Sequence, residues 1–307
     1  MVAIEEYLAT KSPTWTHDSY HWYQKMLGSF LRWCESNNLI DLSQITAVQV
    51  QAFVAAEPQL ADNTKHHRAQ VVKGFLRWCV DDPDFGVKER TVKRIEMPVV
   101  EQSEISIFSD EEIQRLLSAC DHTRHKLRNR ALLLLLLDTG IRLSEACYDG
   151  DRPEETTGLL LDHVILGKRG AESYVIVMGK GRKSRTIKIG DETRLSVQKY
   201  INHERGRSEH PHLFLAQGNT PLNVRTVDQL LKNLGKQARV VNTHAHRFRH
   251  TFAIHQLMAG TSALVLMQLL GHTTLEATKV YTRALTQMQT RQASVSVVDV
   301  MRGKRKH

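Results

Sequence analysis

Residues 243–281 limit most strongly what this chain can fold into and bind, because they gather several basic side chains and a tyrosine within a short helical stretch. At about 100° per residue, His246, Arg249 and His250 fall on one side of a predicted helix, and two phenylalanines fall on the other. The helix is therefore expected to bury its aromatic side in a core and to turn a cationic side toward a ligand.

The sequence after this helix predicts two more helices that bring a tyrosine back to the cationic side chains. An apolar run over 264–270 ends at Gly271, a residue that favours a helix C-terminus. Thr273 and Glu276 have the spacing of a capping box, which starts a new helix. That helix carries Tyr281 about two turns in, facing the cationic cluster. Arginine, histidines and a phenol together make an anion site with a nucleophile beside it.

The charge of the chain is uneven along its length. Residues 1–96 hold 11 Lys and Arg against 12 Asp and Glu, a net of −1. Because the whole chain carries 42 against 33, the remainder carries 31 against 21, a net of +10. An isoelectric point near 9.4 with this asymmetry favours a polyanionic partner, most simply nucleic acid. A solvated basic surface without such a partner is the alternative interpretation.

The sequence favours a cytoplasmic protein without membrane segments. The most apolar stretch, the leucine run 132–137, is far shorter than the roughly 20 residues of a membrane helix. The start of the chain carries Glu5 and Glu6 instead of the basic and apolar regions of a signal peptide. The cysteines lie within apolar helical patterns without a CxxC pair, so we expect reduced core residues. They are Cys34, Cys79, Cys120 and Cys147.

Breaks in the helical pattern divide the chain into successive predicted segments. Pro98 stops a helix and begins a stretch without helical periodicity. Ser109 and Glu112 then have capping-box spacing, so a second domain is expected to begin there. The segments are a helical domain (1–96), a linker (97–107), a second domain (108–285) and a C-terminal helix with a basic tail (286–307).

The first domain is expected to be a small helical bundle. The pentapeptide FLRWC occurs at 30–34 and again at 75–79, which indicates either a repeated helix pair or two helices that fill the same core. The second interpretation is preferred, because five residues can coincide for that reason. Basic side chains are expected on the outer faces of the bundle, namely Lys25, Arg32, Lys65, Arg68, Lys73 and Arg77.

The second domain is predicted to be mainly helical with a small β-sheet. A buried leucine helix over 128–138 ends at Gly140 and is followed directly by Arg142. β-branched runs at 174–178 and 186–189 flank the segment GKGRKS, which predicts a hairpin with Lys180 near its tip. Further helices are expected over 191–205, 224–238, 245–259, 262–270, 274–284 and 287–300.

In this order and context, the basic side chains and the tyrosine resemble the tyrosine recombinase family, which includes phage integrases and Xer-type recombinases. The matching segments are TGIRLSEA, VMGKGRKSRTIKI, HRFRHTFA, LLGH and VYTR, and the resemblance spans roughly residues 107–285. Each motif is short, but they are ordered as in the family, with its nine-residue step from His272 to Tyr281. The helical region before them resembles the family's core-binding domain.

The resemblance implies a role for each matching residue. Glu145 and His250 are expected to support the catalytic side chains. The catalytic set implied by the family is Arg142, Lys180, His246, Arg249, His272 and Tyr281. The residues expected to contact DNA are Lys65, Arg68, Lys73, Arg182 and Lys183.

The chemistry of a phosphodiester explains why these residue types are needed. Two guanidiniums can hold its non-bridging oxygens with fixed donors while charge develops in the transition state. A tyrosine has an ordinary pKa of about 10, so Tyr281 needs a base or orienting partner, for which His246 is the candidate. Lys180 can protonate the leaving 5′-oxygen, and His272 can donate to a non-bridging oxygen. Because arginines supply the charge, no metal, ATP or other cofactor is expected.

The implied protein is a site-specific DNA recombinase or integrase that cuts and rejoins duplex DNA through a 3′-phosphotyrosine. The implied architecture is a C-shaped clamp on DNA, made of the core-binding domain and an α+β catalytic domain. Its expected partners are a duplex recombination site and further copies of the chain, with a monomer or dimer on single sites and a tetramer at the synapse. It is expected to be cytoplasmic, at the nucleoid. The alternatives are type IB topoisomerase-like strand relaxation and an inactive DNA-binding accessory protein.

Simpler roles stay open for the first arginine and the hairpin lysine. Arg142 could cap the preceding helix or pair with Glu145. Lys180 could be a solvated turn residue, and Lys183 or Arg182 competes with it for the catalytic role. The motif order, rather than any one of these residues, supports the recombinase interpretation.

Simpler roles also stay open for the histidines and the tyrosine. His244, His246 and His250 could bind zinc, although neither an HExxH pattern nor a cysteine pair accompanies them. Tyr281 could be an ordinary core aromatic. The polar stretch 148–158 departs from the family pattern, and we interpret it as a surface insertion.

Overall fold

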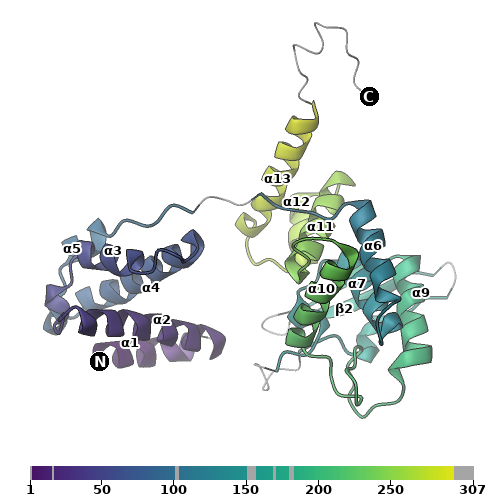
Figure 1. Ribbon diagram of the computed structural model, residues 1–307, viewed down its shortest axis with the longest axis horizontal. Coiled ribbons are helices and arrows are strands. Elements are labelled where there is room, and N and C mark those ends of the chain that lie inside the picture. The colour runs from purple at the N-terminus through teal and green to yellow at the C-terminus, as the bar shows by residue number, and fades with distance from the viewer. Residues whose placement is uncertain are drawn as a thin grey trace, which may run out of the picture. The chain divides into compact units, whose positions relative to one another are not determined.

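A computed structural model describes residues 2–15, 17–100, 104–150, 157–168, 171–179 and 183–293. The chain divides into two compact units, Met1–Ser103 and Glu104–His307, which run from purple to blue and from teal to yellow in Figure 1. Each unit has a hydrophobic core of its own. The predicted fold class, mainly helical with a small antiparallel sheet, is confirmed.

The first unit is a helical bundle in which α4 packs against each of the other helices. Its helices, within the described residues, are α1 (Val2–Lys11), α2 (His17–Ser36), α3 (Ala47–Ala55), α4 (Asp62–Val80) and α5 (Glu89–Arg94). Helix α1 was not predicted from the sequence. Its Tyr7 ring is buried and lies 5.5 Å from the ring centres of both Phe75 and Trp78 in α4.

The two FLRWC segments lie in α2 and α4 and fill one core. Phe30 and Cys34 of α2 are buried in the same cluster as Phe75 and Cys79 of α4. The preferred interpretation of the repeated pentapeptide is therefore confirmed. All four cysteines of the chain are buried and unpaired.

Arg68 lies inside this bundle, so the expectation that it sits on an outer face was wrong. Its side chain is only 9% exposed, and its guanidinium donates to Glu57 and lies 5.1 Å from the ring centre of Phe53. The helical spacing explains the burial, because position 68 falls one turn before the buried Val72 on the apolar face of α4. Arg68 is thus a structural cation.

Replacing Arg68 by alanine is expected to lower the free energy of unfolding by about 2 kcal/mol, because a buried side chain loses its ion pair and its aromatic contact. Arg77, exposed on the same helix, provides the matched control, and its replacement by alanine should change this free energy by less than about 0.5 kcal/mol. Urea denaturation followed by tryptophan fluorescence measures both values. Equal effects of the two substitutions would contradict the structural role.

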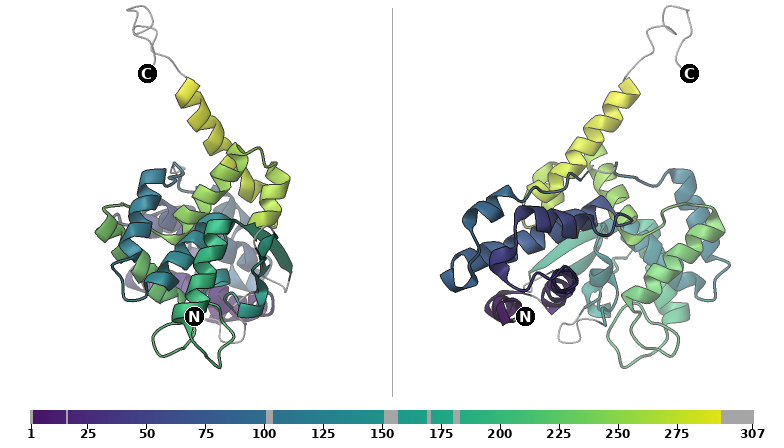
Figure 2. Two further views of the ribbon diagram at one scale, coloured as in Figure 1. Left: turned by 90° about the vertical axis from the view of Figure 1, so that its right-hand side faces the viewer. Right: turned by 60° about the vertical axis from the view of Figure 1, so that its left-hand side comes forward.

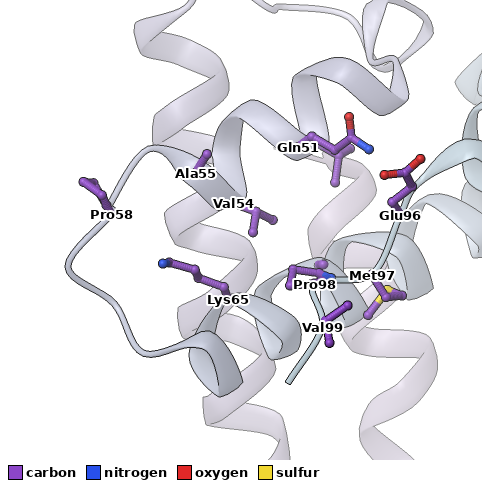
Figure 3. Close-up of a pocket in the computed structure, with 11 residues that line it drawn as sticks. Gln51, Val54, Ala55, Pro58, Lys65, Glu96, Met97, Pro98 and Val99 are labelled. Atoms are coloured by element: carbon purple, nitrogen blue, oxygen red, sulfur yellow. The ribbon is translucent and has the colours of Figure 1, made fainter. Parts of the chain in front are cut away.

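The first unit also contains a cavity of about 510 Å³ between α3, α4 and the segment that follows α5 (Figure 3). Its lining is mostly apolar, and its charged side chains are those of Lys65 and Glu96.

Two lysines that were predicted to contact DNA lie in this bundle. Lys65 is half-buried and pairs with Asp62. Lys73 is also half-buried, and its Nζ donates to the carbonyl oxygen of Ile95 at 2.7 Å. Both lysines therefore have partners within the bundle.

The second unit is built around α7 (Lys126–Thr139), whose leucines at 132–136 are buried. This helix packs against α6 (Asp110–Cys120), α9 (Asp191–Tyr200), α11 (Ala245–Met258) and β3 (Ser184–Ile189). A π-helical turn, Ile201–Arg205, extends α9, so the helix predicted over 191–205 is present with a change of winding. Its helices and strands, within the described residues, are α6 (Asp110–Cys120), α7 (Lys126–Thr139), α8 (Leu143–Ala146), β1 (Val164–Ile165), β2 (Ser173–Met178), β3 (Ser184–Ile189), α9 (Asp191–Tyr200), α10 (Val224–Ala238), α11 (Ala245–Met258), α12 (Ala263–Leu270) and α13 (Glu276–Ala293).

The sheet has the order β1-β2-β3 and is antiparallel throughout. Strands β2 and β3 form the predicted hairpin, with Val175 opposite Ile187, and both of these side chains are buried in the core around α7. Strand β1 was not predicted. The hairpin tip, residues 180–182, and most of the expected insertion, residues 151–156, lie outside the described residues.

The last three helices, α11, α12 and α13, pack together around a smaller apolar cluster. Helix α13 begins at Glu276, and the carbonyl of Leu275 accepts its first backbone hydrogen bonds, so the cap predicted at Thr273 for a helix over 274–284 was wrong. It continues to Ala293 and carries Tyr281, whereas the sequence suggested a break near residue 285. Figure 2 shows its C-terminal part projecting from the unit in both views.

Within the described part of the chain, no helix is both long enough and apolar enough to cross a membrane. The leucine side chains of α7 are buried in the hydrophobic core of the second unit, as the sequence predicted.

Candidate active site

The candidate site of the second unit forms where α7 and α12 end. Both helices end at a glycine in the left-handed conformation, Gly140 with φ 58° and Gly271 with φ 63°. The last carbonyls of a helix lack partners within it and carry the negative end of its dipole. Here, the carbonyl oxygens of residues 269–271 all accept hydrogen bonds from arginines. Two helix C-termini therefore gather cations into one place.

Arg249, on α11, is the most deeply buried of these cations, with 4% of its surface exposed. Its Nη1 donates to Gly140 O at 2.8 Å and its Nη2 to Leu270 O at 2.7 Å, so it joins the two helix ends. Burial, and then the charge of Arg142, lower the pKa of Arg249 to about 10. The side chain thus remains a cation at neutral pH.

Arg142 stands immediately before α8 and is the most exposed arginine of the site, with 42% of its side chain accessible. Its guanidinium lies 3.5 Å from the carbonyl oxygens of Leu270 and Gly271, at the long limit of hydrogen bonding. The alternative pairing with Glu145 is also present: the backbone N–H of Arg142 donates to Glu145 at 2.7 Å, and Nη1 lies 3.3 Å from it. A weakly held, accessible guanidinium is suited to receive an anion.

Arg185, on β3, completes the group and was missed at the sequence level. Its Nη1 and Nη2 donate to the two carboxylate oxygens of Glu145 at 3.0 and 2.8 Å, and its Nε donates to Leu269 O at 2.7 Å. Burial alone would raise the pKa of Glu145, but the hydrogen bonds and charge of Arg185, with help from Arg142, lower it below its ordinary value. Glu145 is therefore a buried carboxylate held by two arginines.

Tyr281 reaches the site from α13 and lies between two histidine rings. Its hydroxyl is 3.2 Å from His250 Nδ1, and its ring stacks against that of His272 with an angle of 8° between the planes. Burial raises the pKa of Tyr281, and the charge of Arg249 and a hydrogen bond to it act in the opposite direction. His272 is held by Thr278, whose hydroxyl lies 2.9 Å from its Nδ1.

Both of these histidines are neutral at physiological pH in the DNA-free protein. Burial lowers the pKa of His250 to about 4, with the neighbouring His246 and His244 adding to the effect. Burial, followed by the charges of Arg249 and the other arginines, also lowers the pKa of His272 to about 4. A neutral His250 can accept a hydrogen bond from the hydroxyl of Tyr281 and so orient it.

His246, the partner expected for Tyr281, is not the histidine that contacts it. His246 is exposed one turn earlier on α11, and its ring stacks on that of His250 with 6.3 Å between the centres. Lys183 is exposed beside the hairpin turn, where its carbonyl accepts a hydrogen bond from Gly179 N. Lys180 and Arg182 lie outside the described residues.

The site is a cluster of positive charge that lacks a matching number of carboxylates. Among the described residues, the guanidiniums of Arg142, Arg185 and Arg249 gather around one carboxylate, that of Glu145, which the first two contact directly. Among the residues that the structure describes, no three His, Cys, Asp or Glu side chains come together as a protein-bound metal ion would require. The surplus of cations favours an anionic ligand with charge on more than one oxygen, such as a phosphodiester.

Comparison with known proteins connects this geometry to one family. Residues 107–288 match the Phage integrase family. The tyrosine recombinase XerC of Bacillus licheniformis is 29% identical over 270 residues, covering 85% of this chain and 84% of that protein. The tyrosine recombinase XerD of Bifidobacterium longum is 26% identical over 297 residues, covering 92% and 89%.

Solved structures share the fold at lower sequence identity. A post-cleavage complex of the XerH site-specific recombinase with a palindromic difH substrate superimposes with a TM-score of 0.72 at 19% identity, covering 90% of this chain and 79% of that one. A lambda integrase dimer bound to a COC′ core site gives a TM-score of 0.71 at 15% identity, with 91% and 94% covered. The chain belongs to the phage integrase family and is a tyrosine-type site-specific recombinase, an enzyme that breaks and rejoins DNA.

Proposed function

We propose that Tyr281 attacks a DNA phosphodiester, forms a 3′-phosphotyrosine and releases a 5′-hydroxyl, and that a 5′-hydroxyl from a second duplex then reverses this step. The observation that supports the proposal best is the position of the Tyr281 hydroxyl, 3.2 Å from a neutral histidine nitrogen and next to the arginine cluster. The phosphate–tyrosine bond replaces the bond to the 5′-oxygen, so the energy for rejoining is conserved and ATP is not needed.

The proposed roles follow the charges of the site. Arg142 and Arg249 hold the non-bridging oxygens as charge develops on them, and His272 donates a further hydrogen bond. His250, which already contacts the hydroxyl, accepts the proton of Tyr281 once the charge of the bound phosphate raises the pKa of this histidine. Lys180 gives a proton to the leaving 5′-oxygen, a role that rests on its motif. The reaction then balances, with one proton taken up at the histidine and one delivered to the leaving oxygen.

The first unit is proposed to be the core-binding domain, which holds the duplex together with the second unit. Lys65, Lys73, Lys183 and Arg182 are the proposed contacts to the DNA backbone, while Arg68 is withdrawn from that set because it is buried. We expect one or two copies on a single site and four in the synapse of two duplexes. The lambda integrase structure, a dimer on a core site, is consistent with the first of these states. Action at the nucleoid would follow from such a substrate.

Covalent capture tests the proposed function and identifies the substrate. The chain is incubated with a library of nicked duplexes in which a random central sequence is flanked by fixed ends, and SDS-resistant complexes are recovered and sequenced. A recurrent sequence, cut at one position with the protein on the 3′-phosphate, is the expected result. Recovery of no adduct, or of adducts on the 5′-phosphate, would contradict the proposal.

Cleavage of the captured duplex is expected to continue in excess EDTA at a rate within about twofold of the untreated reaction. The physical reason is that the guanidiniums of Arg142 and Arg249 neutralise the negative charge of the phosphate, which a metal ion would otherwise do. A loss of cleavage that zinc or magnesium restores would contradict this role for the arginines. Single-turnover cleavage, measured before and after chelation, makes the comparison.

A further inference from the structure

We propose that Arg185 is a positioning residue of this site: it holds Glu145 so that the guanidinium of Arg142 remains free for the scissile phosphate. The inference deepens the proposed function and rests on it. Arg185 lies on β3, the second strand of the hairpin whose turn carries Lys180 in the sequence. Its partner Glu145 lies in α8, 40 residues earlier. The side chain thus joins parts of the site that come from distant segments of the sequence.

The contacts of Arg185 face the protein. Its Nε and both terminal nitrogens each donate to a described partner, and only 13% of the side chain is exposed. Arg142, in contrast, is 42% exposed, and its contacts to the α12 carbonyls are 3.5 Å long. Of these two arginines, Arg142 is therefore the one available to a phosphate, and Arg185 is the one committed to the scaffold.

Glu145 is the residue for which the two arginines compete. Arg185 binds its carboxylate in a bidentate manner at 3.0 and 2.8 Å, whereas the side chain of Arg142 reaches it only through Nη1 at 3.3 Å. A planar guanidinium paired with both oxygens is the strongest arrangement such a pair can adopt. Without Arg185, the buried carboxylate would keep its charge only by drawing Arg142 into the same arrangement.

The backbone around His272 depends on the same guanidinium. Gly271 has φ 63°, and a Cβ at this position would lie 2.9 Å from Nη1 of Arg185, so the guanidinium packs directly on the glycine. Two residues earlier, the carbonyl oxygen of Leu269 accepts a hydrogen bond from Nε of Arg185, which holds the end of α12. Arg185 therefore contacts the segment that leads into His272 as well as the carboxylate beside Arg142.

Arg185→Met is expected to lower the single-turnover cleavage rate of the captured duplex about 10²-fold while changing its dissociation constant by less than about threefold. Arg185→Lys should resemble it, because an ammonium cannot make the bidentate pair. Lys188→Met is the matched control, since Lys188 lies on the same strand and forms only an exposed ion pair with Glu172. It should cleave at the unaltered rate.

Two further measurements separate positioning from a general loss of structure. Adding Glu145→Gln to Arg185→Met removes the competing charge, so the double variant should cleave at least about tenfold faster than Arg185→Met alone. A methylphosphonate at the cut site lacks one charged oxygen, and the defect of Arg185→Met should shrink on it. The defect should persist with sulfur at the bridging 5′-position, because protonation of the leaving group is not what is lost.

The outcomes distinguish this inference from the proposed function itself. If the unaltered chain forms no adduct on any duplex, the proposed function fails, and the role of Arg185 at a scissile phosphate fails with it. If the unaltered chain cleaves, full activity of Arg185→Met overturns the inference. It is also overturned by an equal defect on the unmodified, methylphosphonate and bridging-sulfur duplexes, or by a double variant that cleaves more slowly than Arg185→Met. Rescue by bridging sulfur would overturn it too, because Arg185 would then support the proton donor instead.

Discussion

Tyr281→Phe is expected to bind the captured duplex with unchanged affinity and to form no covalent adduct. The substitution removes one hydroxyl and keeps the ring that stacks on His272, so the packing of α13 is preserved. The lost contacts are the hydrogen bonds of the hydroxyl with His250 and Arg249, and each costs about 1 kcal/mol of stability when it is removed. Covalent attack has no substitute for the missing oxygen, and the loss should therefore be complete. SDS gel electrophoresis of the reaction with labelled duplex makes the measurement.

Tyr200→Phe provides the matched control for this loss. Tyr200 is a buried tyrosine of the same unit, and its hydroxyl accepts a hydrogen bond from the backbone N–H of Leu215 at 3.0 Å. Its replacement by phenylalanine removes a buried hydroxyl that takes no part in the proposed reaction, so adduct formation should continue. An SDS-stable complex formed by Tyr281→Phe would assign the nucleophile to another residue.

Arg249→Lys is expected to reduce cleavage on the order of 10³-fold or more, the range found when a transition-state arginine is lost. Arg249 spans Gly140 O and Leu270 O with separate nitrogens, and a lysine nitrogen cannot reach both carbonyls while also facing a phosphate. DNA affinity should fall much less, because charge on the phosphate increases in the transition state. Single-turnover rates and equilibrium binding, measured on the same duplex, separate the two effects.

Arg247→Lys is the control for burial alone. Arg247 lies on the same helix, is similarly buried, and donates to the carbonyls of Val241 and Ile107, but it packs on Phe108 instead of facing Tyr281. Its replacement should lower the unfolding temperature while leaving the cleavage rate of the folded protein within about threefold. If both substitutions reduce cleavage equally, Arg249 acts through stability and not at the phosphate.

Much of the second unit could be predicted from the sequence, because its signals are local. The leucine helix, the two strands around GKGRKS and the glycines that end α7 and α12 are each visible in a short window. The cationic face of α11 follows from helical spacing alone. Helical spacing does not distinguish His246 from His250, because residues four apart share a face of the helix. Only the packing of α13 against α11 places the hydroxyl of Tyr281 beside His250.

Other features depend on contacts between distant segments and left no local signal. Arg185 is one of several basic residues around the hairpin, and only the fold brings Glu145 to it. Arg68 is different, because its place on the apolar face of α4 was readable from the positions of Val72 and its neighbours. An arginine's charge favours solvent exposure, but here the helical spacing places the side chain in the core. Helix α13 runs on to Ala293 because no glycine or proline interrupts it, a signal that was also present in the sequence.

The central claim, that Tyr281 forms the covalent bond to DNA, is tested most directly by mapping the linkage. The unaltered chain is trapped on the captured duplex, the complex is digested with trypsin and nuclease, and the modified peptide is sequenced by mass spectrometry. We predict a nucleotide joined through its 3′-phosphate to the tyrosine of the peptide Val280-Tyr281-Thr282-Arg283. A nucleotide on any other residue, or a 5′-phosphate linkage to Tyr281, would contradict the account.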